Sequence, residues 1–249
     1  MVSLGLAGTR TRAQALIRAG RVLVDDVPID KPGSRVAAGA AVRVRGETRR
    51  YVSRGGDKLA GALADLRIDP TGLRALDLGA STGGFTDCLL QHGAVHVTAV
   101  DVGYGQLALE LRRDPRVAVA ERTNARHLTA DRVPGVVDLV VVDVSFISAT
   151  WVVAPLSAIC PQAELLVLVK PQFEAGREHV GKGGVVRDDA ARLEAVERVA
   201  GFACERGWRE VGRAESRLAG PKGNREVFLH LRPAAAGSAA PEPGPQPLA

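Results

Sequence analysis

The sequence has 249 residues, of which 46% are hydrophobic, and a formal net charge of +5. This length can bury one large core and leaves room for a small second unit. No stretch approaches the ~18 apolar residues of a membrane span, and the N-terminus lacks the basic and apolar regions of a secretion signal. The three cysteines, at 88, 160 and 204, are too scattered for a disulfide framework or a zinc site. We therefore expect a cytoplasmic protein with no metal and no membrane partner.

Positive charge is concentrated at the start of the chain. Residues 1–54 carry 11 Lys and Arg against 4 Asp and Glu, a net charge of +7, whereas residues 55–249 carry 22 against 24, a net charge of −2. A basic module on a nearly neutral body is typical of nucleic-acid-binding proteins, although a solvated basic face is the alternative. The arginines expected to contact the nucleic acid are Arg10, Arg12, Arg18, Arg21, Arg49, Arg50 and Arg54.

The first 48 residues predict a small α+β unit. Residues 11–19 have the spacing of a short helix, and residues 21–26 and 41–45 predict strands on either side of a Pro- and Gly-bearing stretch. The unit resembles the S4 RNA-binding fold, through the pattern Arg10-x-x-Ala13-x-x-Leu16-Ile17-x-x-Gly20-x-Val22-x-Val24-Asp25. S4 domains normally begin with a further basic helix, which is missing here; either the start codon has been placed too late or the unit is incomplete.

A second domain is predicted over residues 55–232. Residues 49–54 are expected to link the two domains, and residues 233–249, rich in Pro, Ala and Gly, predict a disordered tail. Leucines at helical spacing predict a helix over residues 57–66, with Lys58 in its first turn. Because the helix dipole disfavours a cation there, Lys58 is a candidate functional residue; a chance surface lysine is the alternative.

A strand, a glycine-bearing turn and a helix are predicted over residues 73–78, 79–84 and 85–92. This arrangement can cradle a nucleotide-like ligand, because glycines allow close approach and the N–H groups of the helix start face the ligand. A turn that closes a strand without a ligand is the alternative. The residues expected at the ligand are Gly79, Ala80, Ser81, Thr82, Gly83, Gly84 and Phe85.

Asp101 ends the next predicted strand, residues 95–100, and lies 22 residues after Gly79. In doubly wound folds an acidic side chain at this point binds the two hydroxyls of a ribose. The loop lacks both the G-x-G-x-x-G pattern and the Lys-Ser/Thr ending of a phosphate-binding loop. We therefore expect a ribose-bearing ligand without phosphates, S-adenosylmethionine, rather than a dinucleotide. Val102 is expected beside the same ligand.

A helix over residues 106–113 and a third strand over residues 117–120 follow. The loop after this strand passes the adenine edge of a nucleoside-binding sheet. Asn124 therefore either hydrogen-bonds the base amino group or caps the next turn.

Charged residues also end the later strands. Asp143 ends a strand over residues 138–143, where open α/β sheets place their chemistry, and residues 145–148 are expected to open a helix. Lys170 follows a strand over residues 165–169; a lysine there is costly unless it is paired or used.

The remaining elements complete an α/β fold. A polar, mobile loop is expected over the site at residues 176–184, followed by an amphipathic helix over residues 188–206 with Leu193 facing inward. Strands are predicted over residues 209–216 and 225–231, and Glu226 is either a solvated strand end or part of the site. Together the elements predict a Rossmann-like, seven-stranded S-adenosylmethionine-dependent methyltransferase with a small N-terminal S4-like domain.

The candidates Lys58, Asp143, Lys170 and Glu226 occur in the chain order Lys-Asp-Lys-Glu. This order resembles the catalytic tetrad of the FtsJ-like RNA 2′-O-methyltransferases. The sequence is most similar to the TlyA-type enzymes, which join an S4 domain to such a methyltransferase and have also carried a haemolysin label. The resemblance covers about residues 5–232 and is carried by residues 52–59, 79–86, 101–107, 122–126, 145–148, 169–174 and 220–224.

The resemblance implies methylation of a cytidine ribose 2′-hydroxyl in ribosomal RNA, in the large subunit and in some members also the small. We expect a monomer acting on ribosomal RNA or ribosomal subunits. Lys170 is the candidate for the group that takes the hydroxyl proton or, instead, anchors the charge developing on the oxygen. A non-catalytic RNA-binding protein or a haemolysin-like membrane-active protein is the alternative. A small-molecule methyltransferase would leave the arginine-rich N-terminus unexplained.

Overall fold

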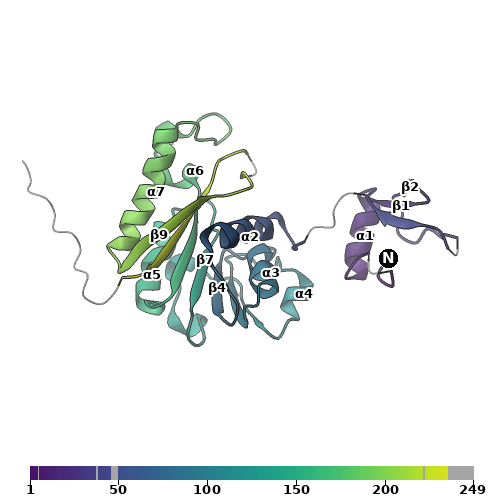
Figure 1. Ribbon diagram of the computed structural model, residues 1–249, viewed down its shortest axis with the longest axis horizontal. Helices are drawn as coiled ribbons and strands as arrows, with labels where there is room; N and C mark the ends of the chain where they lie inside the picture. The colour runs from purple at the N-terminus through teal and green to yellow at the C-terminus, as the bar shows by residue number, and fades with distance from the viewer. Residues whose placement is uncertain (5, 38, 46–49, 221, 235–249) are drawn as a thin grey trace, which may run out of the picture. The chain divides into compact units, whose positions relative to one another are not determined.

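The computed structural model describes residues 1–4, 6–37, 39–45, 50–220 and 222–234. It divides into two compact units, residues 1–50 and residues 51–249, which are described separately (Figure 1). Arg49 lies outside the described residues. So does the predicted tail from residue 235 onward.

The first unit packs helix α1 (Arg10–Arg18) against a small antiparallel sheet of order β2-β1-β3 (Figure 1). The strands are β1 (Val22–Val24), β2 (Val27–Ile29) and β3 (Val42–Val44). β2 was not predicted, because Pro28 argues against a strand; it is tolerated here since β2 is an edge strand. Asp25 and Asp26 both adopt positive φ, 49° and 67°, and form the two-residue turn of the β1–β2 hairpin.

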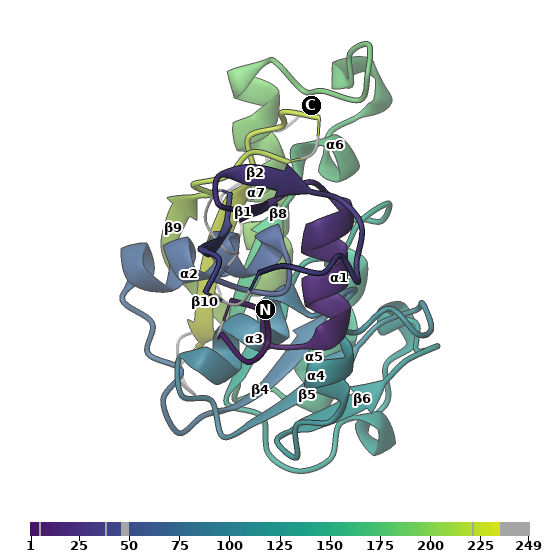
Figure 2. The same cartoon turned by 90° about the vertical axis from the view of Figure 1, so that its right-hand side faces the viewer.

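The second unit is a seven-stranded sheet of order β6-β5-β4-β7-β8-β10-β9. β10 runs antiparallel to both of its neighbours, β8 and β9, and the other neighbouring strands pair in parallel. Figure 2 shows β6 and β9 at opposite edges. This confirms the predicted Rossmann-like sheet, and each strand lies within two residues of its predicted position. The strands are β4 (Arg74–Leu78), β5 (His96–Val100), β6 (Val117–Ala120), β7 (Leu139–Val142), β8 (Glu164–Val169), β9 (Trp208–Glu215) and β10 (Val227–Pro233).

Helices cover both faces of this sheet, and two apolar cores result (Figure 1). One core packs α2 (Arg54–Leu66), α3 (Gly84–Gln91) and α4 (Leu109–Arg112) against one face. The other packs α5 (Thr150–Ile159) and α7 (Asp189–Cys204) against the opposite face. Because β7 and β8 are covered on both sides, their sequences are continuous apolar runs. The remaining short helices are α6 (Pro171–Glu174), η1 (Ala125–His127), η2 (Ala130–Arg132) and η3 (Arg177–His179).

Several predicted details of the helices are wrong. The helix expected to open at residues 145–148 begins at Thr150, because Phe146 adopts a left-handed conformation with φ 70°. Leu193 is 55% exposed: it lies two positions after the buried Ala191 and therefore faces the other side of α7. The helix expected over residues 106–113 is the single turn α4.

The segment expected as a linker packs, from residue 51 on, against the second unit. Tyr51 is 1% exposed in the core that contains α2 and α3. The N–H of Val52 donates to Oδ2 of Asp87 at 2.8 Å, and Ser53 is the N-cap of α2. Since α2 starts at Arg54, three residues earlier than predicted, Lys58 lies in its second turn rather than its first.

Truncation of a buried leucine tests this arrangement of helices. Leu156 of α5 is fully buried, so Leu156→Ala should lower the free energy of unfolding by about 2–5 kcal/mol. Leu193→Ala makes the same chemical change on the exposed side of α7 and should stay within about 0.5 kcal/mol of wild type. Urea unfolding followed by circular dichroism measures both, and equal losses would contradict the assignment of faces.

Candidate active site

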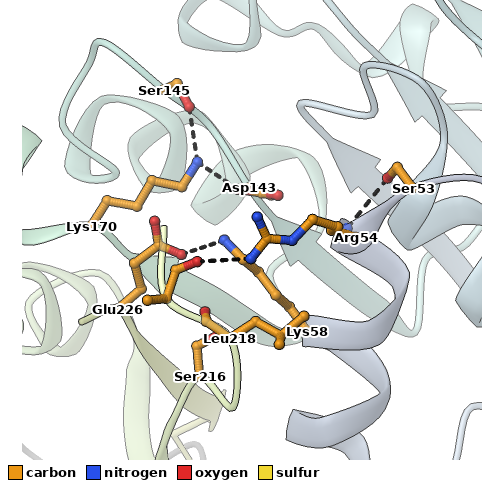
Figure 3. Close-up of polar contacts among 11 residues, drawn as sticks. Ser53, Arg54, Lys58, Asp143, Ser145, Lys170, Ser216, Leu218 and Glu226 are labelled. Atoms are coloured by element: carbon orange, nitrogen blue, oxygen red, sulfur yellow. Dashed lines mark hydrogen bonds and ion pairs between the residues drawn. The ribbon is translucent and has the colours of Figure 1, made fainter. Parts of the chain in front are cut away.

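Four charged side chains converge at the carboxyl edge of the central strands (Figure 3). Asp143 follows β7 and Lys170 follows β8, so two parallel strands bring both residues to one edge. Glu226 precedes β10, and the antiparallel pairing of β10 with β8 places it next to Lys170. Lys58 reaches the same point from α2. The structure thus brings all four sequence-predicted candidates together.

The four residues form two ion pairs, a buried one between Lys58 and Glu226 and a partly buried one between Lys170 and Asp143. Lys58 Nζ lies 2.5 Å from Oε2 of Glu226, and Lys170 Nζ lies 2.6 Å from Oδ1 of Asp143. Glu226 is only 1% exposed, and both lysines are buried. Buried charges of this kind are tolerated as pairs, because removing one partner leaves an uncompensated charge. The arrangement places two ammonium groups side by side, and each of them contacts a carboxylate.

The turn after β4 requires glycine at two positions. Gly79 has φ 90°, and a Cβ there would lie 2.5 Å from the backbone oxygen of Asp143. Gly83, the N-cap of α3, has φ 97°, and a Cβ there would collide with Leu107 and Leu111. Both glycines therefore keep the turn close to the neighbouring strand end and leave the first N–H groups of α3 facing outward.

Asp101 orders this turn from the end of β5. Its Oδ2 accepts the N–H of Ser81 at 2.8 Å, and its Oδ1 accepts the N–H of Gly103 at 2.7 Å. Each oxygen keeps a lone pair for a further donor, and the side chain is only partly buried. Val102 beside it is 73% exposed. Both predicted positions are therefore accessible to a ligand.

The other predicted ligand residues differ in what they can offer. Ser81 and Thr82 are exposed in the turn, whereas Ala80 and Phe85 are buried. The Phe85 ring stacks on Phe228 at 6.0 Å between centroids, so only its backbone could reach a ligand. The Asn124 amide oxygen accepts the N–H of Arg126 at 3.0 Å, which is the capping alternative raised by the sequence.

Sequence reasoning missed Asp77, which is fully buried in β4. Its Oδ2 accepts the Thr86 hydroxyl at 2.6 Å, and Oδ1 has no hydrogen-bond partner among the described residues. Burial raises the pKa of Asp77 to about 7; the Thr86 hydrogen bond opposes this rise, and the charges of Asp143 and Asp101 add to it. The signal available in the sequence was a carboxylate between two leucines of a predicted strand. An unpaired buried acceptor beside the turn is suited to a cationic ligand.

Ser145 was also missed, since residues 145–148 were predicted as helix. Its Oγ accepts a hydrogen bond from Lys170 Nζ at 2.9 Å (Figure 3). The predicted RNA-binding residue Arg54 extends over the same site, and Nη2 donates to the backbone oxygen of Ala219 at 3.5 Å. Figure 3 shows its guanidinium next to Lys58.

The arginines predicted to bind RNA in the first unit lie on α1 and at the start of the sheet. Arg10 and Arg18 are exposed, whereas Arg12 and Arg21 are partly buried. Arg50 is exposed at the boundary of the two units.

The loop over residues 176–184, predicted as mobile, is anchored next to β10. Asn224 Oδ1 accepts the N–H of Val186 at 3.0 Å, and its Nδ2 donates to the oxygen of Gly184 at 2.8 Å. This side chain is 2% exposed and holds the loop against the turn that precedes Glu226.

Within the described ranges, no helix has the length and apolar character needed to cross a membrane. The same part of the chain contains no cluster of three or more His, Cys, Asp and Glu side chains placed to hold a metal ion.

A doubly wound sheet of this strand order, with a glycine-bearing turn after β4 and an acid after β5, defines the class of Rossmann-like methyltransferases. The fold is shared with the N-methyltransferase NodS of Bradyrhizobium japonicum, at a TM-score of 0.52 and 16% identity, over 74% of this chain and 98% of that one. Residues 51–233 match the FtsJ-like methyltransferase family, and residues 1–42 match the S4 domain. The chain belongs to the FtsJ-like methyltransferase family, in the TlyA-type group that carries an S4 domain.

Similarity to individual relatives extends over most of the chain. The chain is 52% identical over 234 residues to the 16S/23S rRNA (cytidine-2′-O)-methyltransferase TlyA of Mycobacterium tuberculosis, covering 93% of this chain and 87% of that protein. It is 40% identical to Hemolysin A of Brachyspira hyodysenteriae, covering 92% and 96%. A solved Streptococcus thermophilus structure with a provisional hemolysin name has a TM-score of 0.74 at 39% identity, covering 94% and 87%. The family resemblance predicted from the motifs is confirmed.

Asp77→Asn tests the cost of the buried carboxyl. The pKa of Asp77 is about 7 in the folded protein and near the ordinary 3.8 when unfolded, so wild type loses stability as pH rises between these values. Asparagine does not ionise, so the variant does not lose stability in this way as the pH rises. The variant should therefore gain on wild type by up to about 4 kcal/mol between pH 4 and pH 7, since one pKa unit corresponds to about 1.4 kcal/mol. Urea unfolding of the ligand-free protein across this range measures the gain; a difference independent of pH would refute the raised pKa.

Proposed function

We propose that the protein transfers a methyl group from S-adenosylmethionine to the ribose 2′-hydroxyl of a cytidine in ribosomal RNA. The observation that carries this proposal is that two buried lysines each contact a carboxylate beside the glycine-bearing turn. A methyltransferase that acts on a small molecule has no need of the basic S4 unit. The printed name of the Mycobacterium tuberculosis relative supports the choice of cytidine and of ribosomal RNA.

The residues around the turn fit S-adenosylmethionine, which supplies a methyl group activated by its sulfonium centre. Asp101 offers carboxylate lone pairs to the two ribose hydroxyls, and exposed Val102 offers an apolar surface to the adenine. The unpaired oxygen of Asp77 suits the cofactor's amino group, because a cation there would offset the cost of an ionised buried carboxyl. Asn124 can meet the base amino group through the second lone pair of its capping oxygen.

Lys170 is the group that we assign to the 2′-oxygen. A ribose hydroxyl is a poor nucleophile, so the site must align it with the methyl group and stabilise the charge that develops on it. Asp143 and Ser145 hold the Lys170 ammonium, and the Lys58–Glu226 pair lies next to it. The arrangement supports electrostatic anchoring of the oxygen by Lys170, with Lys58 as a second positive charge.

The division of labour follows the two units. In this proposal residues 1–48 hold structured RNA and residues 55–232 carry the chemistry, with residues 49–54 between them. Exposed Arg10 and Arg18 neutralise phosphates in the first unit, and Arg54 meets the RNA next to the site. Such an enzyme would act as a monomer on ribosomal subunits in the cytoplasm.

Incubation with labelled S-adenosylmethionine and purified large or small ribosomal subunits tests the function. We expect label in the RNA, at the 2′-oxygen of a cytidine. Tight RNA binding without label transfer would replace the proposal with a non-catalytic RNA-binding protein. Salt-insensitive transfer to a small substrate would replace it with a small-molecule methyltransferase.

Two substitutions separate chemistry from cofactor binding. Lys170→Ala should lower the rate of methyl transfer by about 10²–10⁴-fold, the usual contribution of one positioned group, and leave cofactor affinity nearly intact. Asp101→Ala should weaken cofactor binding first, by about 10–100-fold, because it removes a charged hydrogen-bond acceptor. Single-turnover rates and calorimetric titration with S-adenosylmethionine give both quantities. Equal loss of both properties in both variants would contradict these roles.

The arginines of the first unit should determine the salt dependence of RNA binding. The double variant Arg10→Ala, Arg18→Ala should weaken RNA binding uniformly across sequences and reduce the slope of log K against log salt by about 2, one for each lost phosphate contact. Arg209→Ala, which removes an exposed arginine of β9, is the matched control and should leave the slope unchanged. A double variant with the wild-type slope would exclude these two arginines from the RNA interface.

A further inference from the structure

The Lys170 ammonium group forms an ion pair with a carboxylate and a hydrogen bond with a hydroxyl group. Its Nζ lies 2.6 Å from Oδ1 of Asp143 and 2.9 Å from the hydroxyl oxygen of Ser145, and Figure 3 shows the nitrogen between these two side chains. We propose that Ser145 is a positioning residue for methyl transfer, which orients the Lys170 ammonium group so that another of its N–H groups faces the 2′-oxygen. This inference rests on the proposed function.

Geometry at the ammonium group carries the proposal. A lysine ammonium has three N–H donors on a flexible stem of four carbons. The ion pair with Asp143 holds the nitrogen close to the carboxylate, and the hydrogen bond to Ser145 fixes the direction of one N–H. The directions open to the other two N–H groups are thereby restricted. With Asp143 alone, the nitrogen could rotate about this single contact. The second partner therefore affects the alignment of the reacting oxygen more than the binding of either substrate.

The choice of a hydroxyl over another carboxylate also has a physical reason. A neutral acceptor orients the ammonium group without adding negative charge to the site. A second carboxylate on Lys170 would offset the positive charge that the developing 2′-oxyanion needs. Ser145 thus supplies direction while Asp143 supplies the counter-charge.

The loop that carries Ser145 is held in place at its other end. Glu174, at the end of α6, is 5% exposed; its Oε2 accepts the Ser148 hydroxyl at 2.6 Å and its Oε1 accepts the N–H of Ala149 at 2.7 Å. One short segment, residues 170–174, therefore contacts the loop twice, through Lys170 on Ser145 and through Glu174 on Ser148. Phe146, between the two contacts, has a left-handed backbone conformation, so α5 cannot extend toward the N-terminus beyond it. Ser145 therefore stays in the loop.

Three variants test the proposal. Ser145→Ala removes the hydroxyl, Ser145→Thr keeps it, and Ser148→Ala removes the hydroxyl of the same loop that contacts Glu174 instead of Lys170. Ser145→Ala should lower the single-turnover rate at saturating RNA and cofactor by about 10–100-fold, as expected for one hydrogen bond to a charged group. Its affinities for RNA and for S-adenosylmethionine should match wild type. Ser145→Thr should restore the rate, and Ser148→Ala should lose less than Ser145→Ala.

A second readout does not depend on activity. The chain has only five lysines, so the ammonium signal of Lys170 can be assigned by ¹⁵N side-chain NMR through its loss in Lys170→Ala. We expect this signal to broaden or to show greater motion in Ser145→Ala and to keep its wild-type form in Ser145→Thr and Ser148→Ala.

The outcomes separate this proposal from the function on which it rests. Wild-type protein that methylates no ribosomal RNA would overturn the proposed function and this role with it. Active wild type with an equally fast Ser145→Ala would overturn the role of Ser145 alone. So would a Ser145→Thr as slow as Ser145→Ala, or a Ser148→Ala with the same loss, because either result would point to disruption of the loop.

Discussion

Two buried lysines can share the carboxyl edge of this sheet only because each meets a carboxylate within hydrogen-bonding distance. The sheet topology provides those partners. β8 ends in Lys170, the parallel strand β7 ends at Asp143, and the antiparallel β10 begins next to Glu226. Lys58 arrives from a helix that covers the same edge. Four residues far apart in the chain therefore meet because of strand order and direction, and positive charge is retained where a 2′-oxyanion would form.

Around the turn after β4, where we propose that the cofactor binds, the site carries an excess of negative charge. Asp77, Asp101 and Asp143 lie in or just after three adjacent strands, β4, β5 and β7, so their negative charges repel one another. The repulsion adds to the effect of burial on Asp77, whose Oδ1 has no hydrogen-bond partner in the part of the chain that the structure describes. A cofactor that carries a sulfonium and an ammonium group would relieve this repulsion. At the same edge of the sheet, the aspartates favour a cation at the turn and the lysines favour an anion that develops beside them.

The strands and the tetrad could be predicted because their signals are local or depend on order alone. Covered strands are continuous apolar runs, and charged residues at their ends point to one edge of the sheet. The sequence did not reveal the backbone conformation of individual residues, or which of two possible hydrogen-bond partners a side chain has. Because the left-handed conformation of Phe146 was not foreseen, residues 145–148 were predicted as helix and Ser145 was missed. The edge strand β2 was missed because it contains Pro28. Asn124 had two plausible roles, and the structure shows its cap on the next turn, where its oxygen accepts the N–H of Arg126. Asp77 was overlooked, although a carboxylate between two leucines of a predicted strand was visible in the sequence.

The most direct test is a structure of the protein with S-adenosylhomocysteine and an RNA fragment that contains the target cytidine. The account predicts that Lys170 Nζ lies within about 2.7–3.2 Å of the ribose 2′-oxygen, with both lysine–carboxylate pairs intact. A complex in which the target ribose docks at the cofactor while Lys170 and Lys58 point away from its 2′-oxygen would contradict the account.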